Sequence, residues 1–156
     1  MMEQEYKHIL VGIDGSDQAL SAFKKAVEVD RRNNGTVYVA NVIDQQFYNF
    51  MGYVPIDQSL VEQQTETAKQ MIEECKAYGK SVDYPKIEGI IAYGSVRESM
   101  AVNLPKKYAI DLIMVGQSGL NAVERFMTGS VSSYVIRRAP CDVLIVSDVA
   151  EKPANN

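Results

Sequence analysis

The chain has 156 residues, of which 46% are hydrophobic and 23% charged, the balance of a soluble globular protein with one domain. Its net charge of −4 argues against a nucleic-acid partner, and no apolar run approaches the roughly 20 residues of a membrane span. The first ten residues carry acids ahead of any apolar run, unlike a signal peptide. We therefore expect a cytoplasmic domain over residues 1–149 and a disordered tail at 150–156.

Five short runs rich in Val and Ile have the composition of strands buried on both faces. They are Lys7–Ile13, Thr36–Ile43, Lys86–Ala92, Asp111–Val115 and Asp142–Ser147.

Four segments with helical spacing of apolar residues separate these strands. The first helix is predicted to end near residues 33–35, and the second to run from Leu60 to just before Gly79. Ser95–Glu98 reads as a capping box that begins the third helix, which we expect to stop around Pro105. Ser130–Arg138 is the fourth helix. The alternation predicts an α/β fold, a doubly wound five-stranded parallel sheet with helices on both faces.

In such a sheet, ligands bind beyond the carboxyl ends of the strands. The segment from Gly116 onward lies at that end and carries three of the ten glycines of the chain, Gly116, Gly119 and Gly129. Glycines allow backbone N–H groups to approach a ligand, and a helix that begins at Ser130 offers unpaired N–H groups to an anion. A helix stop and a helix start would also explain Gly119 and Gly129, but the adjoining hydroxyl groups favour a phosphate site.

The spacing G-x2-G-x9-G-S, formed by Gly116, Gly119, Gly129 and Ser130, resembles the ATP-binding signature of the universal stress protein family. The stretches "ILVGIDGSDQALSAFKKAV", "VANVID" and "GSVSSYVIRRAPCDVLIV" also resemble that family. The resemblance covers essentially the whole chain and is weakest between Gln45 and Lys86. It implies strand order 3-2-1-4-5 and a Rossmann-like domain that binds adenine nucleotides.

The resemblance also implies which residues would bind ATP with Mg²⁺ or Mn²⁺. Ile13 and the backbone of Val42 would frame the adenine, and Asp14 would lie near the ribose or a phosphate-bound metal ion. The ribose and phosphates would contact Val115, Gly116, Ser118, Gly119, Gly129, Ser130, Val131 and Ser132. Gln117-Ser118 departs from the Arg or His that many relatives carry there, which weakens the expectation for phosphate affinity.

Asp14 has an alternative role as the N-cap of the first helix, which Ser16 or Asp17 could equally fill. No Walker A lysine follows a glycine loop, and the single histidine, His8, begins the first strand at the wrong end for the site. We expect no catalytic residues and slow or absent hydrolysis, as in a nucleotide-dependent sensor or switch of the stress response. The alternative is a dimeric stress-response scaffold of the same fold that does not bind nucleotide.

The fifth strand would be an apolar sheet edge with no helix after it. We expect a homodimer in which Val143, Leu144, Ile145 and Val146 pair antiparallel across a two-fold axis. The aromatic-rich segment Asp44–Asp57 is either a lid or contact surface, or a helix extension packed on its own domain. Cys75 and Cys141 read as small buried hydrophobic residues.

Overall fold

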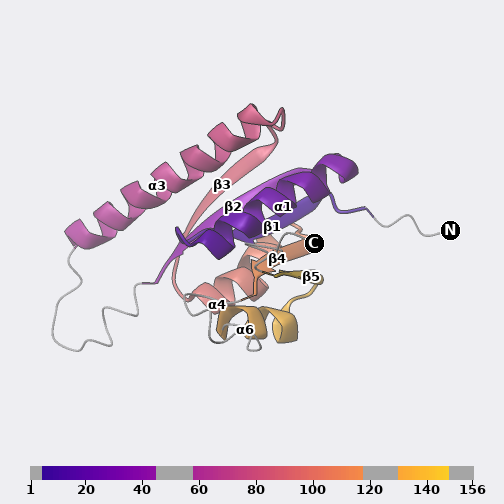
Figure 1. Cartoon of the computed structure of the whole chain (residues 1–156). Coiled ribbons are helices and arrows are strands. Elements are labelled where there is room, and N and C mark those ends of the chain that lie inside the picture. Colours follow the sequence, from indigo (N-terminus) through magenta and orange to yellow (C-terminus); the bar gives the residue numbers. More distant parts are fainter. Residues whose placement is uncertain (1–4, 45–57, 118–129, 148–156) are drawn as a thin grey trace, which may run out of the picture.

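The computed structural model describes residues 5–44, 58–117 and 130–147, and its five strands form one parallel sheet in the order β3-β2-β1-β4-β5 (Figure 1). The fold class and strand order predicted from the sequence are therefore confirmed. The strands are β1 (His8–Gly12), β2 (Thr36–Ile43), β3 (Ile87–Tyr93), β4 (Leu112–Gly116) and β5 (Asp142–Val146). The predictions for segments 45–57 and 150–156 concern residues that lie outside the described part of the chain.

Helical elements connect the strands and cover both faces of the sheet, as Figure 1 shows. They are α1 (Asp17–Asn33), α3 (Gln58–Ser81), α4 (Val96–Glu98), the π-helical turn η1 (Ser99–Asn103), α5 (Leu104–Lys107) and α6 (Ser130–Arg138). The helices α1 and α3 cover one face, and the run α4–η1–α5 together with α6 covers the other. No helix within the described ranges is long and apolar enough to cross a membrane.

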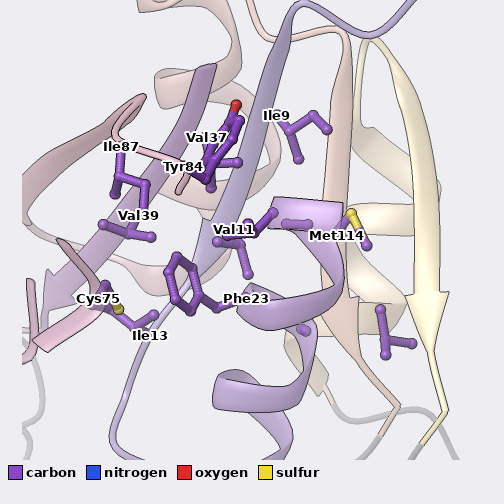
Figure 2. Packing of buried hydrophobic residues seen from close by; sticks show 14 of the residues in the cluster. Ile9, Val11, Ile13, Phe23, Val37, Val39, Cys75, Tyr84, Ile87 and Met114 are labelled. Atoms are coloured by element: carbon purple, nitrogen blue, oxygen red, sulfur yellow. The ribbon is translucent and has the colours of Figure 1, made fainter. Parts of the chain in front are cut away.

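The central strand β1 separates two hydrophobic cores because its side chains alternate between the faces of the sheet. Ile9 and Val11 belong to the core under α1 and α3, whereas Leu10 belongs to the other core, and all three are fully buried. Figure 2 shows the first core, where Phe23 of α1 packs against the face of the sheet that carries Val11 and Val39. A strand buried on both faces explains the nearly continuous apolar run in the sequence.

The helix α1 has a side-chain cap at its start and a left-handed residue at its end. Ser16 has extended backbone, and its hydroxyl oxygen accepts a hydrogen bond from the backbone N–H of Ala19 at 3.2 Å. Asn34 adopts the left-handed conformation at φ 55°, as the sequence predicted for the stop near residues 33–35. Local sequence signals therefore fix both ends of this helix.

Gly79 is not the stop that the sequence suggested for the second helix, because α3 continues to Ser81. A Cβ atom at this position would overlap the side chain of Ile87 and the backbone carbonyl of Tyr84. Glycine is therefore required here for the close approach of the helix to the start of β3, and its effect on the helix end is secondary.

The prediction that the third helix stops around Pro105 is also wrong, since the helical run continues through α5 to Lys107. The π-helical turn η1 ends two residues before this proline, and the N–H of Leu104 donates to the carbonyl of Ser99, five residues back. The wider turn accommodates a residue that lacks an N–H, so the helix passes the proline instead of ending. Only half of the predicted capping box forms, because Ser95 accepts from the N–H of Glu98 while the Glu98 carboxylate contacts Tyr134.

Truncation of Phe23 tests whether the α1 face of the sheet carries the stability of the fold. Phe23→Ala should lower the free energy of unfolding by about 3–5 kcal/mol, because the side chain is fully buried and leaves a cavity. Leu20→Ala, on the same helix but 44% exposed, should change it by less than about 0.5 kcal/mol. Urea denaturation of both variants measures the difference, and similar losses would contradict this packing.

Candidate functional site

A cavity of about 390 Å³ lies at the carboxyl end of the sheet, where the strand order changes direction at β1. In open parallel sheets this is the position where ligands bind. Residues from β1, β2, β4 and the helices α1, α4 and α6 converge on it. The lining residues are Gly12, Ile13, Asp14, Ser16, Gln18, Ala19, Ala40, Asn41, Val42, Val96, Met100, Val115, Gly116, Ser130, Val131 and Ser132.

The structure brings together the site residues that the sequence predicted, as far as it describes them. Those that line the cavity are Ile13, Asp14, Val42, Val115, Gly116, Ser130, Val131 and Ser132. The remaining predicted residues, Ser118, Gly119 and Gly129, lie outside the described residues. Residues more than 100 positions apart in the chain thus share one cavity.

Asp14 lies in the turn between β1 and α1 and is exposed. Its Oδ1 accepts a hydrogen bond from the backbone N–H of Ser16 at 2.9 Å, which fixes the carboxylate at the mouth of the cavity. Ser16 caps the helix, so the alternative in which Asp14 is the N-cap does not hold. The other carboxylate oxygen is therefore not needed for the cap, and it can meet a hydroxyl group or a metal ion.

Val42 lies two residues beyond Ala40, whose carbonyl accepts the last backbone hydrogen bond from the β1 side. The carbonyl of Ala40 accepts from the N–H of Ile13 at 2.8 Å, toward β1, while the carbonyl of Ile43 accepts from Gly94 at 2.9 Å, toward β3. Because backbone groups alternate in direction along a strand, Val42 faces the same side as Ala40. Its N–H and C=O therefore point into the gap that opens where β1 ends.

Asn41 is a site residue that the sequence analysis missed. Its Nδ2 donates to the carbonyl of Ile13 at 3.0 Å and lies 3.6 Å from the sulfur of Met71. Both contacts use amide hydrogens, so the oxygen Oδ1 is the end that can accept from a ligand. The only sequence signal was a polar residue inside an otherwise apolar strand.

Met100 and Gln18 were also missed, because each reaches the cavity from a helix. Met100, in the π-helical turn, is buried, and its Cε lies 3.2 Å from the position that a Cβ of Gly12 would occupy. Gln18, in the first turn of α1, packs against Gly116. No local motif marks such residues, because only the docking of the helices on the sheet brings them to the cavity.

The helix α6 presents its N-terminal end to the cavity through Ser130, Val131 and Ser132. The hydroxyl of Ser132 donates to the carbonyl of Gly116 at 2.9 Å and thereby attaches the helix to the end of β4. A second contact fixes the helix from outside, where the hydroxyl of Tyr134 donates to the carboxylate of Glu98 in α4. This hydrogen bond raises the pKa of Tyr134.

The electrostatics of the cavity depend on one carboxylate and one helix end. Among the lining residues that the structure describes, Asp14 alone carries a charge, and most of the others are apolar. The N-terminus of α6 adds unpaired N–H groups and a partial positive charge. Nowhere in the described part of the chain do three His, Cys, Asp or Glu side chains gather in a way that could hold a metal ion.

The described lining holds no histidine, cysteine or lysine. His8 lies at the amino end of β1, away from the cavity, where its Nδ1 is 3.1 Å from the hydroxyl of Tyr38. Burial raises the pKa of the Cys75 and Cys141 thiols to about 11, which keeps them protonated and unreactive. The cavity can hold a flat apolar group, offer hydrogen bonds to its edge and accept an anion at a helix end.

A second cavity of about 520 Å³ adjoins the first and shares Asp14, Asn41 and Val42 with it. Its other side is formed by residues of α3, including Gln63, Thr67 and Met71. The hollow at the carboxyl end of the sheet therefore extends from α6 across β1 and β2 to α3.

Comparisons with known proteins identify a family for this chain. The model of the universal stress protein family matches residues 5–147. A protein of Staphylococcus aureus (strain USA300), named for the universal stress proteins, is 39% identical over 150 residues, which is 96% of this chain and 89% of that protein.

Solved structures show the same relationship. The universal stress protein UspA from Lactobacillus plantarum superposes with a TM-score of 0.80 at 27% identity, covering 92% of this chain and 99% of that one. A universal stress protein solved in complex with cAMP has a TM-score of 0.69 at 25% identity, covering 92% of this chain and 98% of that one.

The Ser132 hydrogen bond predicts a difference in stability between two neighbouring serines. Ser132→Ala should lower the free energy of unfolding by about 1–2 kcal/mol, because the partly buried Gly116 carbonyl loses the donor that the buried Ser132 supplies. Ser130→Ala, at the exposed start of α6, should change it by less than about 0.5 kcal/mol. Thermal or urea unfolding compares the two, and equal effects would show that the hydrogen bond does not hold α6 to β4.

Proposed function

We propose that this chain, which belongs to the universal stress protein family, binds ATP with Mg²⁺ or Mn²⁺ in the strand-end cavity and acts as a nucleotide-dependent sensor or switch in the stress response. The observation that carries the proposal is the convergence of three groups on one cavity. These are the Val42 backbone, the Asp14 carboxylate and the N-terminus of α6. They match the edge of a base, a ribose or metal ion, and a phosphate.

The adenine would lie against the apolar part of the cavity. Ala40, Val115 and Met100 supply that surface, and the N–H and C=O of Val42 point into the gap beside it. An N–H next to a C=O is complementary to the acceptor and donor along one edge of adenine. The solved relative in complex with cAMP carries an adenine nucleotide as well, which supports this choice of base.

The phosphates would lie at the start of α6. A helix N-terminus binds anions through its unpaired N–H groups, and the predicted residues Gly119 and Gly129 would extend this surface. Because the described lining offers no cationic side chain, a divalent metal ion held between Asp14 and the phosphates would neutralise much of the remaining charge.

The same composition argues for binding without efficient turnover. Phosphoryl transfer requires a positioned metal ion, a cationic clamp and a group that orients the nucleophile. Asp14 supplies part of the first requirement, and the described lining supplies neither of the others. We therefore propose that hydrolysis is slow or absent, as suits a cytoplasmic sensor whose state follows the bound nucleotide.

Calorimetry with ATP in the presence and absence of Mg²⁺ tests the proposal. Wild-type protein should bind ATP more tightly with Mg²⁺, and Asp14→Asn should weaken the Mg²⁺-dependent affinity about tenfold, or about 1.4 kcal/mol. The asparagine oxygen still accepts from Ser16, so the turn should be retained. Asp17→Asn, which removes a nearby exposed carboxylate outside the cavity lining, is the matched control and should bind as wild type does.

Titration of AMP and cAMP in the same buffer shows how much the phosphate chain contributes. If no adenine nucleotide binds at millimolar concentration, the nucleotide proposal fails. In that case the alternative, a scaffold of the same fold that does not bind nucleotide, is supported.

We also propose that the protein forms a homodimer through β5. This strand pairs only with β4 within the described sheet, and Val143–Val146 therefore present an edge that is free to pair with a second copy. Leu144 on this strand is 39% exposed, an apolar side chain that such pairing would cover. A two-fold axis beside β5 would make the contact closed and antiparallel.

Sedimentation velocity of two lysine variants tests the β5 interface. Leu144→Lys should shift the protein from dimer to monomer. The substitution places a lysine charge on each β5 strand, either opposite the lysine of the second copy or against its apolar side chains. Leu60→Lys, on α3, alters a side chain that is also 39% exposed and should leave the dimer unchanged. A dimer that persists in the Leu144 variant would exclude this interface.

A further inference from the structure

A buried carboxyl group lies near the amino ends of the strands, at the end of the sheet opposite the cavity. Asp30, near the end of α1, has 0% of its surface exposed. Its Oδ2 is 2.6 Å from the hydroxyl oxygen of Tyr84, which is also 2.6 Å from the carbonyl oxygen of Gly35. Tyr84 itself belongs to the core under α1 and α3, beside Val37 and Ile87 (Figure 2). The three residues come from α1, the residue before β2 and the chain just before β3.

The number of hydrogens in this group determines the protonation state that fits the geometry. The Tyr84 hydroxyl has one hydrogen, yet it makes two short contacts with oxygen atoms, the Gly35 carbonyl and the Asp30 carboxyl. If Asp30 were ionised, one of these contacts would bring two oxygen lone pairs together at 2.6 Å without a hydrogen between them. If Asp30 is protonated, it donates to Tyr84 and Tyr84 donates to Gly35.

The other oxygen of Asp30 leads to the same conclusion. Oδ1 is buried and has no hydrogen-bond partner among the described residues. It packs so closely against Gly35 that a Cβ at that position would overlap it. An unsatisfied oxygen of a neutral acid costs much less free energy than one that shares a full negative charge.

The charged and titratable neighbours do not supply a counter-ion in direct contact. Lys86, before β3, favours the charged form, but its Nζ donates to Asn34 Oδ1 at 2.7 Å. Asp111, before β4, opposes it, and the carboxylate of Asp111 accepts from the backbone of Lys7 and His8.

On the remaining elements, Arg31 of α1 lies over the ring of Tyr84, and Lys7 before β1 pairs with Glu5. Tyr38 of β2 is a weakly acidic neighbour, and burial and, less strongly, the charge of Asp30 raise the pKa of Tyr38. Burial is the largest influence and raises the pKa of Asp30, while hydrogen bonding to Tyr84 and to the backbone of Gly35 acts in the opposite direction. Burial and the contact with Asp30 also raise the pKa of Tyr84, which therefore keeps its hydrogen.

We propose that Asp30 remains a neutral carboxylic acid in the folded protein at pH values where an exposed aspartate is ionised, and that it serves as a proton-dependent latch that joins α1 to the starts of β2 and β3. Its hydrogen lies between Oδ2 and the Tyr84 hydroxyl, and the Tyr84 hydrogen lies on the Gly35 carbonyl. The latch does not depend on nucleotide binding, since none of its residues lines the cavity.

The latch makes stability depend on pH in a direction opposite to that of most carboxylates. An aspartate in the unfolded chain releases its proton at about pH 3.9, whereas the raised pKa of Asp30 keeps the proton in the folded state. Above pH 3.9 the folded state therefore binds more protons than the unfolded state, and stability falls as pH rises toward the folded pKa. The full contribution is present below about pH 3.9.

Asp30→Asn tests this proposal because an amide reproduces the neutral acid, with Nδ2 in place of the hydroxyl donor. We expect urea midpoints of wild type and Asp30→Asn to be closest near pH 4 and to diverge up to pH 8 as wild type loses stability relative to the variant. The ratio of the two folding equilibrium constants should change at least tenfold over this range, the effect of one unit of pKa. Asp17→Asn, an exposed change in the same helix, should follow the pH dependence of wild type.

The opposite divergence, in which the variant loses relative stability as pH rises from 3 to 6, would show that Asp30 is ionised and would overturn the proposal. A direct measurement covers the case in which Asp30→Asn does not fold. In wild-type protein with ¹³C-labelled aspartate, the Asp30 carboxyl carbon should titrate about one pH unit or more above the carboxyl carbons of the exposed aspartates. A titration midpoint at or below about 3.9 would exclude the neutral acid.

Discussion

The central strand β1 ends three residues before its neighbour β2, and this difference in length determines where the cavity and the helices around it lie. β1 pairs with β2 on one side and β4 on the other, and its last rung with β2 joins Gly12 to Ala40, while β2 continues to Ile43. The chain then leaves the sheet at Ile13 and enters α1. The gap beyond Gly12 exposes the backbone of Val42 and receives the N-terminus of α6. A longer β1 would close this gap with ordinary strand pairing.

The gap is built to recognise a ligand by shape and backbone groups more than by charge. Its floor is apolar, its directional groups are backbone N–H and C=O, and Asp14 is the charged residue of the described lining. Such a surface suits a planar group with a polar edge, and the helix end beside it suits an anion.

The two ends of the sheet, where the strands begin and where they finish, use polar groups in opposite ways. At the carboxyl ends, backbone groups and a carboxylate remain open to a ligand. At the amino ends, polar groups bond to each other, as in the buried contact of Asp30 with Tyr84 and the partly buried contact of Asp111 with the backbone of His8 in β1. The helix α1 spans both ends of the sheet, with its Ser16 cap at the cavity and Asp30 near its other end. The polar groups at the amino ends stabilise the fold, and those at the carboxyl ends are available to a ligand.

Much of this architecture is predictable from local sequence. The Val- and Ile-rich runs marked all five strands within a residue or so of their ends, and Asn34 and Ser130–Arg138 marked helix boundaries correctly. Family resemblance led to Ile13, Asp14 and Val42, which do line one cavity.

Where local reading failed, contacts distant in sequence were responsible. Gly79 reads as a helix stop, but its lack of a side chain serves the approach of Ile87. Pro105 reads as a helix end, yet a π-helical turn ahead of it lets the helix continue. By itself the sequence determined the order of strands and helices and the residues at the strand ends, because those depend on neighbours along the chain. Only the tertiary structure decided that Asn41, Met100 and Gln18 share the cavity and that Asp30 faces Tyr84, because these contacts exist only once helices pack on the sheet.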